Sequence, residues 1–416
     1  MNSRRISQKS ILLFAISLLT LLISGTVIYS IEQFKRLRDI TLVVLFALQL
    51  LLIMKTLKTT VRLKKSLGLI AAGALVFFGV SVFVHPSSAF NFFSKVLMFM
   101  LFCMLFYDQQ NARRLLRYLY NLVVAISVVG LFFFVALYIL KLPLPFTQLN
   151  NGFFRSYLYL FYDVEAYRET IGPFVYYRLQ SVFWEPGVFG IYLILSLFYY
   201  AFLDEEKDKR KLYILLICLF LTSSTTGTIL GLFVIAVFLI RKIKKQRIRL
   251  FVIIPSAILT AIAAYYLLMA KKNGGGGYSA SYILRMVDLN SSLTIWKQHF
   301  LFGTGYNNVN EFEKLTSIWQ RQNSNGFMNW CMTMGLWGLI VQMLPLIVNV
   351  LKSRKRQRLI HIVFAIVYIG INMTEPLITS PLMIMLLSLD YVVMVKQTRG
   401  GRIHGFEREK ISVGVS

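Results

Sequence analysis

Charged residues are scarce in this chain, and acidic residues are the scarcest among them. Only 15% of the 416 residues are charged, with 18 acidic against 45 basic side chains. Soluble domains carry roughly a quarter charged residues, whereas this chain is 57% hydrophobic and has a mean hydropathy of +0.64. The composition excludes an ordinary soluble domain and predicts an integral membrane protein.

Cysteine and histidine are also scarce. The three cysteines, Cys103, Cys218 and Cys331, fall in apolar runs, and the four histidines form no pair at helical spacing. Three widely spaced cysteines indicate neither a disulfide framework nor a zinc site. We therefore expect buried thiols, no metal and no cofactor.

The apolar runs contain almost no charge. Only Lys95 and Asp390 occur within them, both towards the ends of a run. Ion-coupled transporters usually carry ionisable groups near the membrane midplane. This absence argues against a secondary transporter, but it leaves a lipid flippase open.

Apolar runs near the ~20 residues that a bilayer requires recur along the whole chain. One further run, 212–240, is too long for one span and too short for two ordinary ones. The clear runs lie near 11–30, 40–54, 67–84, 88–107, 119–140, 186–203, 250–270, 327–351, 359–373 and 379–395.

The distribution of Lys and Arg decides how the run 212–240 crosses. With the amino terminus inside, 31 of the 45 basic residues fall in inner segments, as the positive-inside rule requires. This holds only if 212–240 crosses an even number of times, as two short spans or as a re-entrant hairpin. We predict an all-α integral membrane protein with about 12 transmembrane helices, both termini cytoplasmic and two large extracytoplasmic loops.

This topology accounts for the net charge of +27 without nucleic acid, although the same residues also suit anionic lipid head groups. It also divides the chain into regions. These are a five-span bundle (1–140), a first outer loop (141–185), central spans with a polar break at 222–227 (186–270), a second outer loop (271–326), three C-terminal spans (327–395) and a basic cytoplasmic tail (396–416).

The first outer loop ends in the segment Arg-Leu-Gln-Ser-Val-Phe-Trp-Glu-Pro-Gly, residues 178–187. Aromatic residues make up 13 of the 39 positions from 146 to 184, against 15% for the whole chain. Two interpretations stand: an interfacial belt at the lipid head groups, and a platform on which sugar rings stack. For the second we single out Tyr176, Tyr177 and Trp184.

The second outer loop contains a run of four glycines at 274–277, followed by apolar residues at intervals of three to four up to Phe300. This spacing predicts an amphipathic helix along the outer membrane surface, with Trp296 as a further sugar-stacking candidate. The Gly303-x-Gly305 that follows is typical of a simple turn, with phosphate binding as the alternative. The backbone N–H and C=O groups of the polar break at 222–227 must form hydrogen bonds with other parts of the protein or with water in a cavity.

Together these motifs resemble a known family. Arg-x-x-Ser-x-Phe-x-Glu-Pro-Gly at 178–187, the Ser/Thr-rich break before Gly227, Arg285 ahead of Trp296, and Asn323-Ser-Asn-Gly before an apolar span look like the O-antigen and capsular polysaccharide polymerases. These are the Wzy-type enzymes, related to the O-antigen ligases. The resemblance covers roughly residues 140 to 395.

The resemblance implies a glycosyltransferase of the bacterial inner membrane. Its donor is a glycan on undecaprenyl diphosphate and its acceptor is another lipid-linked repeat unit, with a flippase and a chain-length regulator of the same pathway as partners. It also implies functional arginines in both outer loops, at Arg178 and Arg285. Two departures occur: Thr225 stands where family members often have arginine, and Gln322 stands where ligases commonly have histidine, which favours a polymerase.

The chemistry assigns roles to these residues. When a sugar is transferred from a lipid diphosphate, the diphosphate leaves as an anion, and we expect Arg178 and Arg285 to bind it. The attacking hydroxyl requires a base, for which we choose Glu185. Simpler roles remain for each residue: a snorkelling anchor for Arg178, an interfacial charge for Arg285, and helix capping for Glu185. Rival outer acids are Asp163, Glu165, Glu169, Asp288 and Glu375.

Three functions therefore remain in order of preference. The first is a polymerase of lipid-linked repeat units. The second is a ligase that transfers finished glycan to another acceptor, and the third is a lipid-linked oligosaccharide flippase or transporter.

Overall fold

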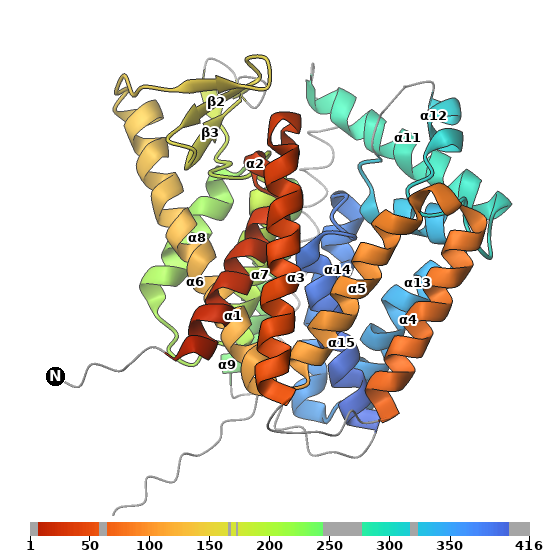
Figure 1. Ribbon diagram of the computed structural model, residues 1–416. Helices are drawn as coiled ribbons and strands as arrows, with labels where there is room; N and C mark the ends of the chain where they lie inside the picture. Colours follow the sequence, from red (N-terminus) through yellow and green to blue (C-terminus); the bar gives the residue numbers. More distant parts are fainter. Residues whose placement is uncertain are drawn as a thin grey trace, which may run out of the picture.

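The protein is a bundle of long apolar helices with smaller elements gathered at one end (Figure 1). The computed structural model describes residues 7–57, 65–164, 168–171, 174–243, 277–316 and 323–398. The strands of the first outer loop and helices α11 and α12 of the second lie at the same end of the bundle. The two loops that carry the predicted site residues therefore share one end of the molecule.

Each predicted apolar run overlaps one or two helices, except 250–270, which lies outside the described residues. A chain in hydrocarbon must satisfy its own backbone, and a helix does this within one segment. The helices are α1 Gln8–Ile23, α2 Val27–Ser30, α3 Lys35–Leu57, α4 Lys65–Val84, α5 Ala89–Phe106, α6 Gln109–Phe134 with a π-helical turn Val135–Ile139, α7 Pro186–Phe202, α8 Lys209–Leu221, α9 Thr225–Lys242, α11 Gly277–Gln298, α12 Asn310–Thr316, α13 Gly326–Lys352, α14 Lys355–Thr374 and α15 Pro381–Thr398.

Seven of the described helical segments are long and apolar enough to cross a membrane, and three shorter apolar helices accompany them. This agrees with a predominantly helical, multi-pass membrane protein. The number of about 12 crossings and the cytoplasmic placement of the termini stay predictions. The three cysteines are buried, as expected.

Segments predicted to lie on the inner side contact one another at the other end of the bundle. Lys9 Nζ forms an ion pair with Asp108 at 2.9 Å, and Lys396 Nζ donates to the carbonyl of Tyr107 at 2.8 Å. Arg117 pairs with Glu206 in the same region. These contacts join segments that the distribution of Lys and Arg places on the same side of the membrane.

The first span is not one helix over 11–30, which corrects the sequence prediction. Helix α1 ends at Ile23 and α2 begins at Val27. At Gly25 an added Cβ would lie 2.7 Å from Val188 Cγ1 at the start of α7, and the Trp184 N–H donates to the Gly25 carbonyl at 3.3 Å. The interruption between α1 and α2 therefore holds Trp184, the residue before Glu185, in place.

The run 212–240 forms two helices, and that it crosses the membrane an even number of times stays a prediction. Helix α8 ends at Leu221, Ser223 adopts φ = 49°, and α9 begins at Thr225. The Ser224 hydroxyl caps α9 by accepting the Gly227 N–H at 3.2 Å. Because 13 residues rise about 20 Å, α8 is shorter than the ~30 Å hydrocarbon core.

The first outer loop contains short strands, which the all-α prediction did not include. Strands β1 Thr147–Leu149, β2 Phe154–Tyr157 and β3 Phe161–Asp163 form an antiparallel sheet, and β4 Arg168–Ile171 pairs with β5 Phe174–Tyr177. The aromatic residues that suit strands are partly internal: Phe161 and Tyr162 are 0% and 1% exposed. Phe161 packs into the main helical core and Tyr162 into a small separate cluster, so neither ring is accessible to lipid or sugar.

The Gly-x-Gly at 303–305 is a structural turn, as preferred from the sequence. Gly303 has φ = 69°, and an added Cβ would lie 2.4 Å from the Thr333 backbone of α13. The Thr304 N–H donates to the carbonyl of Met332 at 3.0 Å. Helix α13 admits this contact because Gly335, with φ = 63°, interrupts its helical backbone.

We expect Gly303→Ala to destabilise the protein. The substitution forces a side chain into a left-handed backbone and against Thr333, and strain of this kind destabilises proteins by roughly 1–3 kcal/mol. Thermal unfolding of the detergent-solubilised chain measures the effect. Gly73→Ala in α4 is the matched control, since its Cβ would meet no atom within 4 Å, and an unchanged midpoint for Gly303→Ala contradicts the prediction.

Candidate active site

Two carboxyl groups from distant parts of the chain meet near the end of the bundle that carries the two predicted outer loops. Glu185 is the residue before α7, and Glu375 is the residue after α14. Their side chains share a hydrogen bond. Gly187 makes room for them, because an added Cβ would lie 2.7 Å from Glu375 Oε1 and 3.3 Å from Glu185 Oε1.

Glu375 is 7% exposed, and its environment favours the protonated form. Burial raises the pKa of Glu375 well above its ordinary value, and the charge and hydrogen bond of Glu185 raise it further, while Arg285 and Arg178 oppose the shift. Two carboxyl groups share a hydrogen bond only when one holds a proton. Glu375 therefore favours the protonated form, in which its O–H can donate the shared hydrogen bond to Glu185.

Arg285 of α11 brings positive charge to this pair. Its Nη2 lies 3.7 Å from Glu375 Oε1, and the arginine side chain is 43% exposed against 10% for the glutamate. This distance is an ion pair without a close hydrogen bond. An exposed guanidinium with several N–H donors can therefore also contact an anion that arrives from outside.

Arg178 brings the second positive charge, and it is held by the polar break before α9. Its Nε donates to the carbonyl of Thr222 at 2.9 Å, and the neighbouring Leu179 N–H donates to the Leu221 carbonyl at 2.9 Å. Backbone carbonyl groups at the break thus accept hydrogen bonds from the first outer loop. A guanidinium therefore reaches the break from residue 178.

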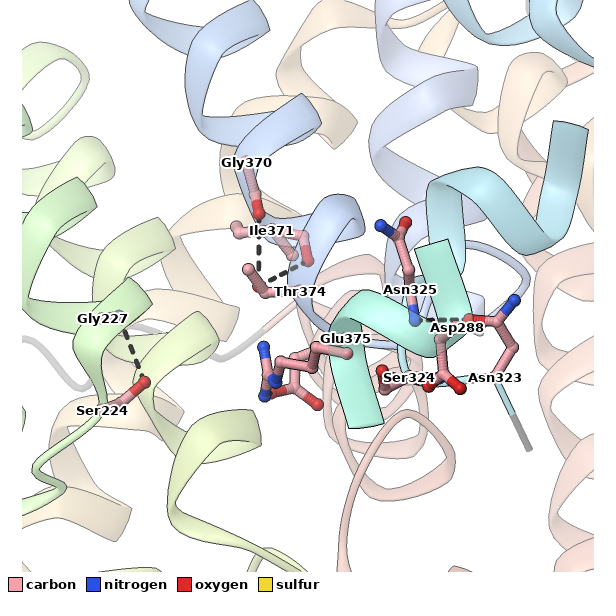
Figure 2. A network of polar contacts seen from close by, with 11 residues as sticks. Ser224, Gly227, Asp288, Asn323, Ser324, Asn325, Gly370, Ile371, Thr374 and Glu375 are labelled. Atoms are coloured by element: carbon pink, nitrogen blue, oxygen red, sulfur yellow. Dashed lines mark hydrogen bonds and ion pairs between the residues drawn. The ribbon is translucent and has the colours of Figure 1, made fainter. Parts of the chain in front are cut away.

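The Asn323-Ser-Asn-Gly motif attaches α11 to the loop that carries Glu375. Asp288 Oδ2 of α11 accepts hydrogen bonds from the Ser324 N–H at 3.0 Å and the Ser324 hydroxyl at 2.6 Å. An added Cβ at Gly326 would lie 2.5 Å from the Glu375 carbonyl oxygen. In Figure 2, Glu375 is drawn between these contacts and the Ser224–Gly227 cap. The motif therefore sets where Arg285 and Glu375 meet.

The structure places Glu185, Arg178 and Arg285 around Glu375, and their roles in a reaction stay predictions. Glu185 occupies the N-cap position of α7, as the capping interpretation expects, but its side chain makes no capping hydrogen bond. Among the rival acids Asp288 holds Ser324, and Asp163 lies 3.9 Å from Arg155 in the sheet. Glu165 and the Glu169 side chain lie outside the described residues.

The predicted sugar-stacking residues are dispersed. Tyr177 stacks on Tyr138 with ring centroids 4.0 Å apart, and the Tyr176 hydroxyl donates to the Leu221 carbonyl at 3.1 Å. Trp184 is half-buried beside Glu185. Trp296 stands about three turns beyond Arg285 on α11, roughly 16 Å along the axis, so it is not beside the carboxyl pair. A glycan-binding role stays a prediction for all four.

The central position of Glu375 had a signal in the sequence that was not used. Glu185-Pro186 and Glu375-Pro376 are the two Glu-Pro pairs of the chain, and each stands at the outer end of an apolar run. Proline after an acid at a helix boundary ends or starts a helix there. Two such boundaries on one side predict neighbouring carboxyl groups.

These features define a multi-pass membrane protein with a carboxyl pair and two arginines at one end of its helix bundle. The Wzy_C family model, described as O-antigen ligase, matches residues 212–343. This match confirms the family resemblance and supports a membrane glycan-processing role. It includes the polar break, Arg285 and the Asn323-Ser-Asn-Gly motif, whereas Arg178, Glu185 and Glu375 lie outside it. No curated protein matches the chain.

Proposed function

We propose that the protein is a glycosyltransferase that polymerises repeat units linked to undecaprenyl diphosphate. The reaction takes place at the outer face of the bacterial cytoplasmic membrane, and the product is a surface polysaccharide. One observation carries the proposal: Arg178 and Arg285, from the two outer loops, converge on the Glu185–Glu375 pair. A flippase and a chain-length regulator are the expected partners in the pathway.

The two arginines hold the donor diphosphate. When the bond between the sugar and the diphosphate oxygen breaks, the electron pair leaves with the diphosphate, and positive charge placed there stabilises the transition state. Arginine keeps its charge near a membrane and matches phosphate oxygens with two parallel N–H groups.

The carboxyl pair activates the acceptor. As the acceptor oxygen bonds to the anomeric carbon, its proton passes to Glu185, and Glu375 orients Glu185 through their hydrogen bond. A base is required because the attacking group is an ordinary hydroxyl. The displacement resembles that of an inverting glycosidase with the acceptor hydroxyl in the place of water.

Ligation is the second candidate, and the description of the matching family model as O-antigen ligase favours it. Gln322, which favours a polymerase, lies outside the described residues. A ligase transfers finished glycan once to a different acceptor, and a flippase forms no glycosidic bond. Their products therefore separate the three functions.

The purified chain in liposomes is expected to convert lipid-linked single repeats into a ladder of longer lipid-linked products. Arg178→Ala is expected to lower this activity by about 10²–10³-fold because it removes charge from the leaving diphosphate. Arg155→Ala in the same loop is the control, since Arg155 pairs with Asp163 at 3.9 Å.

Each alternative predicts another result in this assay. A ligase gives one transfer to an added second acceptor and no ladder, and a flippase gives no product. A normal ladder with Arg178→Ala at normal abundance contradicts the role assigned to this arginine.

A further inference from the structure

A cavity of about 690 Å³ lies between α4, α5, α13 and α15, separate from the carboxyl pair. It follows the whole of α15, from Thr379 just before this helix to Thr398 at its end. The 18 residues of α15 rise about 27 Å, close to the ~30 Å thickness of the hydrocarbon core. The cavity therefore extends through most of the apolar depth of a membrane.

The shape and lining of the cavity suit a lipid chain. Its wall is almost wholly apolar, with Phe77, Val96 and Leu387 among the residues that line it. Three other lining side chains, Val76, Trp337 and Leu344, are 68%, 48% and 42% exposed, so the cavity is open along one side. Its volume is within the range of about 300–1,000 Å³ found for ligand pockets.

A lysine interrupts this apolar wall near its outer end. Lys95 lines the cavity about one turn below Phe92, whose ring lies 4.7 Å from that of Tyr306 in the second outer loop. Arg38 at the start of α3 is close enough for its charge to act on Lys95. In the part of the chain that the structure describes, no ion pair includes either cation.

Lys95 lines the cavity, whereas Arg38 stands beside it and donates to the Tyr29 carbonyl at 3.3 Å. Two neighbouring positive charges beside an apolar cavity are costly without a counter-charge. Ionisable side chains within membrane-spanning segments are usually functional. A lipid with a phosphate head group would supply the counter-charge and place its chain in the cavity.

We propose that this cavity binds the lipid-linked acceptor, with its diphosphate at Lys95 and Arg38 and its polyprenyl chain along α15. The proposal rests on the proposed polymerase function, in which two lipid-linked glycans must bind at once. Arg178 and Arg285 take the diphosphate of the donor. The outer end of the cavity reaches Ile378 and Thr379, in the same short loop as Glu375, so a glycan carried there approaches the carboxyl pair.

Three substitutions separate this site from the catalytic one. Lys95→Met removes the charge with little change of size. Gly73→Leu fills the cavity, because Gly73 lines it and an added Cβ would meet no atom within 4 Å. Gly79→Leu is the matched control on the same helix: its Cβ also meets no atom within 4 Å, and Gly79 is not among the residues that line the cavity.

Equilibrium binding to the full chain in phosphatidylcholine nanodiscs tests the proposal, with a polyprenyl-diphosphate-linked single repeat as the probe. Wild type is expected to bind two lipids per chain, and Arg285→Ala to weaken one site only. Lys95→Met is expected to weaken the other site by about 10- to 100-fold, as for loss of a charged hydrogen bond. Gly73→Leu is expected to weaken the same site because its side chain occupies the space of the lipid chain. Gly79→Leu is expected to bind like wild type.

One bound lipid in wild type, or two unchanged sites in Lys95→Met, would overturn the proposal. Displacement by phosphatidylglycerol at equal affinity would also overturn it and indicate an ordinary membrane lipid. A chain that binds two lipids but transfers no sugar would contradict the polymerase function while supporting the second lipid site.

Discussion

Glu185→Gln is expected to lower the rate of glycosyl transfer by about 10²–10⁴-fold, the usual contribution of a general base. Glutamine keeps the size of the side chain but cannot take the proton of the acceptor hydroxyl. Single-turnover transfer from a defined lipid-linked donor, with both lipids saturating, measures the chemical step directly.

Glu375→Gln is expected to reduce the same rate less than Glu185→Gln. The glutamine amide still donates a hydrogen bond to Glu185, which is the role that the protonated Glu375 has in the pair. Glu311→Gln is the control, because this glutamate pairs with His299 on the second outer loop at 3.0 Å. A wild-type rate for Glu185→Gln, or a larger loss for Glu375→Gln, contradicts the assignment of the base.

Arg285→Ala is expected to lower kcat/KM for the donor by about 10²–10³-fold, because it removes charge from the leaving diphosphate. Arg285→Lys restores the charge without the planar fork and is expected to recover only part of the activity. Lys297→Ala, on the same helix, is the control for general loss of positive charge. Equal kcat/KM for Arg285→Ala and wild type excludes the role in diphosphate binding.

The same variant is expected to change the pH dependence in one direction. The charge of Arg285 lowers the pKa of Glu375, so its removal raises that pKa and keeps Glu375 protonated to higher pH. Because the protonated form of Glu375 orients the base, we expect the alkaline limb of the pH–rate profile to move to higher pH. An alkaline limb that moves to lower pH, or stays in place, shows that Glu375 does not control it.

The helices were largely predictable, whereas their interruptions were less so. An apolar run in a membrane has little alternative to a helix, which is why the runs beginning near residues 88, 186 and 327 coincide with α5, α7 and α13. The end of α1 at Ile23 depends on the approach of Gly25 to Val188, a contact between segments far apart in the sequence. The sheet of the first outer loop likewise depends on rings such as Phe161 finding a core.

The candidate site was predicted in part. Arg178 and Glu185 stand in one short motif, and Arg285 stands in a second one, so their residue types alone suggested an anion site. The pairing of Glu185 with Glu375 was not predicted, because it joins the start of α7 to the end of α14 and requires Gly187 and Gly326 to admit close approach.

By itself the sequence determined that this chain is a multi-helix membrane protein with charged residues gathered in its loops, because hydrophobic length and the placement of Lys and Arg act locally along the chain. Only the tertiary structure decided that Glu375 is the partner of Glu185, and that Lys95 faces a long apolar cavity. Both features arise where helices distant in sequence pack together. Burial and neighbouring charge then favour the protonated form of Glu375 and make the charge of Lys95 costly.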